Sequence, residues 1–310
     1  MFRKLPLVLS TFWAPTCALA WGCSGHHIVA WIAEGHLSAN ALAEVSKLLK
    51  AEPIDANLSR YCKDEPADPF VASATWADDV KSAEGAATCH YIDIPLGIPQ
   101  GDASKYCEPV GPLRGGARAG CLLTALDNQS LVLKGGSPAE RVRALRYLIH
   151  LVGDLHQPLH VSDNADRGGN CVPVFLGPDS LEVNLHSAWD SAILETALQQ
   201  RHRTPQEFAC ELDQRYQRNF DDWANKTRSP EQWAWGVHEI ASKTTYGKLQ
   251  PNVPVEPANT VTDCVSSAAK IRGLHILLTA EYQSSAMQAI ESLLAMAGYR
   301  LAGILNRTWP

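Results

Sequence analysis

Two pairs of residues in this sequence combine an imidazole with a carboxylate at a spacing of four. His150 precedes Asp154, and His186 precedes Asp190. Residues four apart lie on the same face of a helix. Imidazole nitrogen and carboxylate oxygen are both ligands of zinc. One pair alone could be a hydrogen bond or ion pair on a helix surface, but two pairs, with His160 close behind the first, indicate a metal site.

The first pair lies in an apolar stretch that predicts a helix. Its apolar residues recur at the helical repeat, at Leu145, Leu148, Ile149, Val152 and Leu155. Pro158 cannot continue the helix and disfavours helical angles at the residue before it. We therefore expect His160 just past the helix end, near Asp154 but on a different course of the chain. Such an arrangement can place ligands around more than one metal ion.

Helical periodicity also predominates in other parts of the sequence. Helices are expected at 41–50, 74–81, 184–194, 205–223 and 263–305. Residues 170–176 and 181–184 are typical of two short strands joined by the turn Gly177-Pro-Asp-Ser180. Residues 89–93 are also rich in strand-favouring types. The predicted fold is mainly α, a single helical domain around a metal cleft, with one small β-hairpin.

The first twenty residues have the features of a secretion signal. They begin with basic Arg3 and Lys4, continue with an apolar run too short to span a membrane, and end in the small-x-small sequence Ala18-Leu-Ala20. Cleavage between Ala20 and Trp21 would make Trp21 the first residue of the mature chain. We therefore expect a secreted or periplasmic protein without a membrane anchor.

Residues 1–20 are thus predicted to be a signal peptide and residues 21–310 one domain, because no linker composition or repeat marks a boundary. The formal charge of the whole chain is −6, and it becomes −8 when Arg3 and Lys4 are removed. An acidic chain argues against a broad basic face that grips duplex DNA. Any attraction for nucleic acid is expected to be local, for example from bound metal.

Cysteine usage agrees with export. Of nine cysteines, Cys17 would leave with the signal, and the remaining eight could form disulfide bonds in an oxidising compartment. No Cys-x-x-Cys is present, which argues against zinc bound by thiolates. Spacing does not determine the connectivity. The first pair expected is Cys107 with Cys121, which would close a short Gly/Pro-rich loop.

Seven motifs, in order along nearly the whole mature chain, resemble those of a known family. They are Trp21-Gly-x-x-Gly-His26, Trp76-Ala-Asp78, His90-Tyr-Ile-Asp93, the stretch from Leu145 to His160, Gly168-Gly-Asn170, the stretch from Asn184 to Asp190, and Gly298-Tyr-Arg-Leu-Ala302. The family is that of the zinc-dependent, single-strand-specific nucleases and 3′-nucleotidases of the S1/P1 type. Its fold is similar to that of the zinc phospholipases C.

The resemblance implies a cleft with three zinc ions and assigns nine residues to them. The first zinc would be bound by Asp78, His90, His150 and Asp154. The second would be bound by His160, His186 and Asp190. The third would be bound by the free amine and carbonyl of Trp21, by His26, and by Asp154 as a bridge.

The resemblance also implies hydrolysis of single-stranded DNA and RNA to 5′-nucleotides, and of 3′-mononucleotides, by a metal-bound hydroxide that attacks phosphorus. Asp78 and Asp154 would be the catalytic carboxylates. Tyr91 and Asp93 would stack on and hydrogen-bond an unpaired base. Lys81, one helical turn after Asp78, is a candidate phosphate contact. The alternatives for these last three are structural: a core tyrosine, a turn-forming aspartate and a solvated lysine.

Two other functions remain open on the sequence alone. A zinc phospholipase C has the same N-terminal tryptophan and order of ligands, but carries Glu where this chain has Asp190. A non-catalytic exported zinc-binding protein would share the ligands as well. For the nuclease we expect nucleic acids and nucleotides as substrates, no obligate protein partner, and a monomer.

Overall fold

The computed structural model describes residues 21–107, 121–225, 229–256, 264–265 and 272–310. In this part of the chain the fold is mainly α, as predicted, with two small sheets of two strands each. The predicted signal peptide, residues 1–20, lies outside the described residues, as does most of the stretch from 257 to 271.

The helix predicted around His150 is α6 (Pro138–Leu155). Ser137 and Glu140 form a capping box at its start, and a proline at its first position needs no N–H partner. Every residue from Ala144 to Leu155 is buried. The helix ends before Gln157, whose backbone is extended, as expected for a residue that precedes proline.

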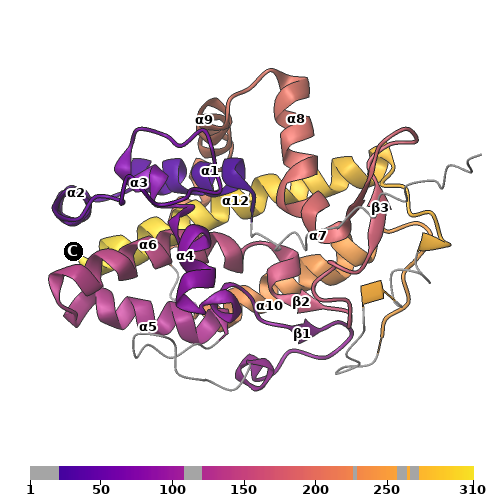
Figure 1. The fold of residues 1–310 in the computed structure, drawn as a ribbon, viewed down its shortest axis with the longest axis horizontal. Coiled ribbons are helices and arrows are strands. Elements are labelled where there is room, and N and C mark those ends of the chain that lie inside the picture. Colours follow the sequence, from indigo (N-terminus) through magenta and orange to yellow (C-terminus); the bar gives the residue numbers. More distant parts are fainter. Residues whose placement is uncertain (1–20, 108–120, 226–228, 257–263, 266–271) are drawn as a thin grey trace, which may run out of the picture.

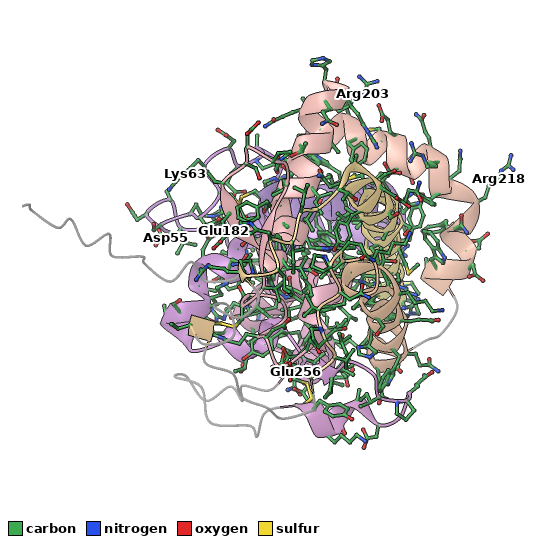
Figure 2. The ribbon with its side chains drawn as sticks, turned by 90° about the vertical axis from the view of Figure 1, so that its right-hand side faces the viewer. Asp55, Lys63, Glu182, Arg203, Arg218 and Glu256 are labelled. Atoms are coloured by element: carbon green, nitrogen blue, oxygen red, sulfur yellow. A yellow bond between two sulfur atoms is a disulfide. The ribbon has the colours of Figure 1, made fainter. Side chains whose placement is uncertain are left out.

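Two further helices form the centre of the molecule with α6. The longest helix, α12 (Ala280–Thr308), crosses the molecule, and α1 (Cys23–Gly35) packs against it (Figure 1). α6 contacts both of them and packs along α5 (Leu122–Gly135). Figure 2 shows side chains filling the space between these elements, with charged residues such as Arg203 and Arg218 at the periphery. In the part of the chain that the structure describes, no helix combines the length and apolar character needed to span a membrane.

Shorter helices surround this centre. They are α2 (Ala39–Ala51), α3 (Pro69–Ala72), α4 (Trp76–Glu84), α7 (Leu185–Ser187), α8 (Ile193–Arg201), α9 (Pro205–Tyr216) and α10 (Pro230–Ile240). Turns of 3₁₀ helix are η1 (Ala87–His90), η2 (Ala103–Tyr106), η3 (Pro158–His160) and η5 (Gln217–Asn219). Turns of π helix are η4 (Ala188–Ala192), η6 (Asp221–Asn225) and η7 (Ala241–Tyr246). The helix predicted at 184–194 is α7, η4 and α8 in succession, and Asp190 lies in its π turn.

The predicted hairpin is present as β3 (Pro173–Phe175) and β4 (Glu182–Asn184), which pair antiparallel with Val174 opposite Val183. A second pair, β1 (Ile94–Pro95) and β2 (Ser162–Asp163), is parallel and was not predicted. The strand tendency of residues 89–93 gives a different result. Cys89 and His90 belong to η1, and the strand begins only at Ile94.

Three disulfide bonds join segments of the described chain. They are Cys107–Cys121, as predicted, Cys23–Cys62 and Cys171–Cys264. Cys89, which is buried, and Cys210, which is exposed, are not joined to another cysteine among the described residues. The bond from Cys23 ties the start of α1 to the loop after α2, and so restrains the segment next to Trp21.

Candidate metal centre

Asp154 and His150 lie on the buried part of α6, and neither has any exposed surface. Two elements bring further ligand atoms to them. α4 presents Asp78 from its first turn, and η1 ends at His90. Oδ2 of Asp154 lies 3.0 Å from Nδ1 of His90 and 3.2 Å from Nε2 of His150.

The fourth atom of this group comes from Asp78. Its Oδ1 lies 3.7 Å from Nδ1 of His90 and 3.7 Å from Nε2 of His150. The two ring nitrogens are themselves 3.0 Å apart. Two nitrogens and two carboxylate oxygens of the set predicted for the first zinc therefore lie close together. The groups whose ligand atoms all lie within 4.8 Å of one another are His90, His150 and Asp154, and a second that joins Asp78 to His26 and His150.

The other oxygen of Asp154 faces α1. Oδ1 lies 3.4 Å from Nε2 of His26, and the His26 ring stacks on His150 with centroids 4.0 Å apart. Oδ1 and both ring nitrogens of His26 are buried without a hydrogen-bond partner among the described residues. Buried polar atoms are normally satisfied, so Oδ1 and the Nε2 that it faces fit a bound cation. Asp154 thus has one oxygen for each of two neighbouring groups, as expected of a bridge.

Two glycines allow the close packing of α1 against α6 and against Trp21. A Cβ on Gly153 would lie 2.9 Å from Nδ1 of His26, and a Cβ on Gly25 would lie 2.8 Å from Cβ of Trp21. Trp21 itself is completely buried, and the adjoining Gly22 donates its N–H to the backbone oxygen of Asp190 at 2.7 Å. The predicted N-terminus therefore packs beside the His26 group.

A separate group is formed by η3, α7 and η4, which supply His160, His186 and Asp190 respectively. The two Nε2 atoms lie 3.1 Å apart. Oδ2 of Asp190 is 3.2 Å from Nε2 of His186, and its Oδ1 is 3.9 Å from Nε2 of His160. This is the set predicted for the second zinc, and three protein ligands leave room for substrate, as catalytic zinc sites do.

Backbone carbonyls orient three of the imidazoles. Nδ1 of His150 donates to the oxygen of Ala74 at 2.7 Å, and Nδ1 of His160 donates to the oxygen of His90 at 2.7 Å. Nδ1 of His186 donates to the oxygen of Gly168 at 2.6 Å. Because a carbonyl can only accept, each bond places the proton on Nδ1 and leaves Nε2 free for a metal.

Burial and charge set the protonation of this centre. Burial, together with His150, lowers the pKa of His26 well below its ordinary value, so that its ring is neutral. Burial opposes a charge on His150, but Asp154 and Asp78 outweigh it and raise its pKa to about 9. Burial would raise the pKa of Asp154, yet His150 and the hydrogen bonds from His150 and His90 hold it well below the usual range. A divalent metal would replace the proton on His150.

Comparison with known proteins agrees with the resemblance of the motifs. The family model described as S1/P1 nuclease matches residues 21–309. The chain belongs to the S1/P1 nuclease family. It is 27% identical to nuclease S1 of Aspergillus oryzae, over 99% of this chain and 98% of that protein. It is 27% identical to endonuclease 4 of Arabidopsis thaliana, over 94% and 89% of the two chains, and 26% identical to nuclease P1 of Penicillium citrinum, over 92% and 97%.

In this S1/P1 family member, the three residues predicted to contact substrate differ in burial. Tyr91 and Asp93 follow His90 directly and are partly exposed. Lys81 is buried, only 7% exposed, and its Nζ donates to Oδ1 of Asp78 at 2.9 Å. Lys81 is therefore not a solvated surface lysine. Its contact with phosphate, and the contacts of Tyr91 and Asp93 with a base, stay predictions.

The sequence did not reveal every residue that supports the S1/P1 centre. Gln157 is completely buried and donates through Nε2 to Oδ1 of Asp190. The backbone carbonyls of Ala74, His90 and Gly168, which accept hydrogen bonds from the imidazoles, were also missed. Every residue has a backbone carbonyl, so the sequence does not show which of them will contact a ligand. For Gln157 the available signal was its position between Asp154 and His160, within the ligand-bearing stretch.

Histidines that were not assigned to zinc have other partners. His27 bonds to Glu65, His36 to Asp213, His156 to the oxygen of Val152, and His238 to Ser162. None of these belongs to the three groups of converging ligand atoms found among the described residues.

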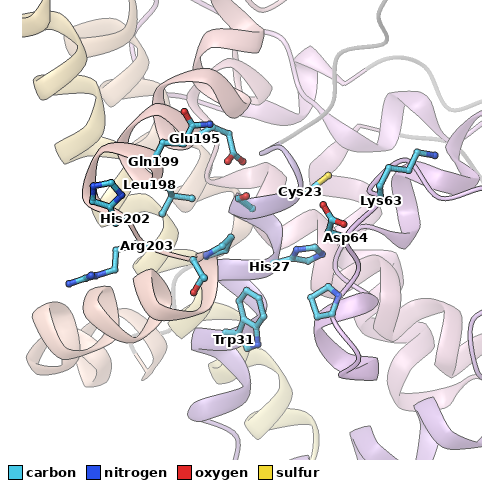
Figure 3. Close-up of a pocket in the computed structure, with 14 residues that line it drawn as sticks. Cys23, His27, Trp31, Lys63, Asp64, Glu195, Leu198, Gln199, His202 and Arg203 are labelled. Atoms are coloured by element: carbon cyan, nitrogen blue, oxygen red, sulfur yellow. The ribbon is translucent and has the colours of Figure 1, made fainter.

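A surface pocket of about 810 Å³ lies beside the same N-terminal helix (Figure 3). Its wall includes His27 and Trp31 of α1, Leu198 of α8, and the charged residues Lys63 and Arg203. None of the nine predicted ligands lines it. The pocket is therefore distinct from the metal centre, although His27 follows His26 in the chain.

Proposed function

We propose that this protein is an exported zinc-dependent nuclease that hydrolyses single-stranded DNA and RNA to 5′-nucleotides and also acts on 3′-mononucleotides. The observation that carries the proposal is the position of Asp154, a fully buried carboxylate with its two oxygens directed at different groups of histidines. Membership of the S1/P1 nuclease family supports the same reaction class.

The residues present fit three zinc ions. The donors are imidazole nitrogens and carboxylate oxygens, and several of them are buried without any partner among the described residues. When bound, zinc ions activate water and stabilise charge on the phosphate and on the leaving oxygen. Asp78, His90, His150 and Asp154 would hold the first ion. His160, His186 and Asp190 would hold the second. Trp21, His26 and Asp154 would hold the third.

The charge of this centre gives a reason for phosphate to bind there. Three zinc ions would bring six positive charges, and the carboxylates of Asp78, Asp154 and Asp190 would neutralise three of them. The centre would keep a net charge of about +3 within a mature chain of formal charge −8. Substrate attraction therefore needs no basic surface.

The protein's own groups would position the reactants. Asp154 would fix the separation of two neighbouring ions, because both of its oxygens are used. Lys81 already contacts Asp78 and would add a positive charge beside the phosphate. Tyr91 and Asp93 would receive a base next to His90, and a base can stack only when it is unpaired. Preference for single strands would follow.

Export is supported by the predicted signal at residues 1–20 and by the three disulfide bonds, which persist in oxidising compartments. Cleavage at Ala20/Trp21 would also free the amine that the third site needs. We infer that the nuclease acts as a monomer, without an obligate protein partner.

A substrate test distinguishes the proposal from its competitors. Mature protein, loaded with zinc, should release soluble nucleotides from denatured DNA and from RNA, and should leave phosphatidylcholine intact. Asp154→Asn should abolish the release, whereas Asp127→Asn, on the exposed face of α5, should not. Cleavage of the lipid without cleavage of nucleic acid would indicate a phospholipase C. No hydrolysis despite full zinc loading would indicate a binding protein.

A further inference from the structure

Gln157 connects the two parts of the metal centre through its backbone. Its N–H donates to the oxygen of Asp154 at 2.9 Å, and its own oxygen accepts from the N–H of His160 at 3.0 Å. It therefore lies between the end of α6, which carries the bridging carboxylate, and η3, which carries a ligand of the second group.

The hydrogen bonds of the Gln157 side chain determine which amide atom is the oxygen and which is the nitrogen. Its Oε1 accepts from the backbone N–H of Leu159 at 2.5 Å. A backbone N–H cannot accept, so the oxygen of the amide must face Leu159 and the nitrogen must face the opposite side. On that side the amide nitrogen meets Oδ1 of Asp190.

This contact gives the two oxygens of the Asp190 carboxylate different partners. Oδ1 is engaged by Gln157, while Oδ2 lies 3.2 Å from Nε2 of His186, in the group of converging ligand atoms. Oδ1 also lies 3.9 Å from Nε2 of His160, so Oδ2 is the oxygen that lies closer to a ligand nitrogen of the group. Without the amide donor, Oδ1 would lose this hydrogen bond in a buried site, and the carboxylate could rotate.

We propose that Gln157 is a positioning residue that holds Asp190 as a ligand through one oxygen at the second metal site. The inference rests on the proposed zinc centre. Partners outside the ligand shell typically change metal affinity by about 10–100-fold when they are removed. We expect loss of the amide donor to weaken the second zinc within that range and to leave the other two ions in place.

Two substitutions separate positioning from mere packing. Gln157→Glu keeps the length of the side chain and an oxygen for Leu159, but replaces the donor with an oxygen that repels Asp190. Gln157→Met keeps the volume and removes both hydrogen bonds. Positioning predicts weaker zinc in both variants. A packing role, or a role for the Leu159 bond alone, predicts that Gln157→Glu binds zinc like the wild type.

The matched control is Gln283, which is partly buried and whose amide donates to the oxygens of Leu176 and Leu278 at 2.7 and 2.6 Å. Gln283→Glu and Gln283→Met should not change zinc binding. Zinc retained against a competing chelator is measured for each protein, below the melting temperature of its metal-free form. That melting temperature reports separately on folding.

The outcomes keep the two hypotheses apart. Wild-type protein that does not bind three zinc ions would contradict the zinc centre itself. Wild-type protein with three ions, and a Gln157→Glu variant with three ions of unchanged affinity, would overturn only the role of Gln157. Selective weakening of one ion in both Gln157 variants, with both Gln283 variants unchanged, supports it.

Discussion

Oδ1 of Asp154 lies 3.4 Å from Nε2 of His26, while the other oxygen of the same carboxylate lies within 3.2 Å of the nitrogens of His90 and His150. A carboxylate with no exposed surface thus serves two groups of imidazoles from opposite sides. In Asp78 a single oxygen, Oδ1, lies 3.7 Å from the ring nitrogens of both His90 and His150, and a ligand atom of this carboxylate also lies within 4.8 Å of one of His26.

Asp154→Asn should therefore be more damaging than Asp78→Asn. The first change removes negative charge and an oxygen ligand from two predicted zinc sites, and the second change affects one site. Zinc analysis should show a loss of more than one equivalent in the Asp154 variant and about one in the Asp78 variant. Nuclease activity should fall by more than the roughly 100-fold that marks the upper end for outer partners. Equal zinc contents in the two variants would contradict the bridge.

Gly153→Ala should weaken the third zinc. The added Cβ would lie 2.9 Å from Nδ1 of His26, closer than real side chains allow, so the His26 ring must move. Chelator competition should show one zinc weakened by about tenfold or more. Gly236→Ala is the control, because Gly236 is an exposed glycine of α10 with no atom within 4 Å of its added Cβ. That change should leave zinc unaffected and stabilise the helix by up to about 1 kcal/mol. The same zinc affinity in both variants would show that His26 does not need its present position.

His238 should contribute to the loss of stability in acid. Burial lowers its pKa from 6.5 to about 4, and its Nδ1 bonds to the hydroxyl of Ser162. A lowered pKa means that the folded state favours the neutral ring, so its contribution is complete above about pH 6.5 and is lost as the pH falls toward 4. In chemical unfolding, His238→Gln should lose less stability than the wild type between pH 6.5 and 4.

The control for this prediction is Gly236→Ala, at an exposed position of α10, because it changes no ionisable group. Its stability should change with pH as that of the wild type does. If His238→Gln also follows the wild type, the titration of His238 does not contribute to acid stability.

An extra residue before Trp21 should remove one zinc. The amine would become a peptide nitrogen, which has no lone pair available for a metal. A chain that begins with Met before Trp21 should still fold, retain two zinc ions and lose most of its nuclease activity. Removal of the methionine by an aminopeptidase should restore the third zinc ion and the activity at about pH 8, where at least about half of the free amines are deprotonated. Three zinc ions in the extended chain would show that the amine is not a ligand.

Local spacing was sufficient to predict the helical parts of the site. The pairs His150/Asp154 and His186/Asp190 needed only the helical repeat, and Pro158 was sufficient to place His160 after α6. The turn at residues 177–180 likewise predicted the β3–β4 hairpin. These features depend on interactions between residues that are close in the chain, so they can be predicted from the spacing of residue types in the sequence.

Other features depend on contacts between distant segments and were not predictable in this way. The strand tendency of residues 89–93 was overridden because the oxygen of His90 accepts from the His160 ring and the N–H of Ile92 donates to the oxygen of His160. The β1–β2 pair forms for the same reason, since Ile94 meets Ser162 only after His160 has been placed. Burial of Lys81 beside Asp78 also required the packed structure.

The proposed three-zinc centre can be tested by a crystal structure of the correctly processed mature protein, with anomalous diffraction measured at the zinc absorption edge. Three zinc peaks are expected. One should lie among Asp78, His90, His150 and Asp154, and one among His160, His186 and Asp190. The third should contact His26, Asp154 and the free amine of Trp21. Fewer than three peaks in zinc-saturated crystals, or a third peak away from His26 and Trp21, would contradict the claim.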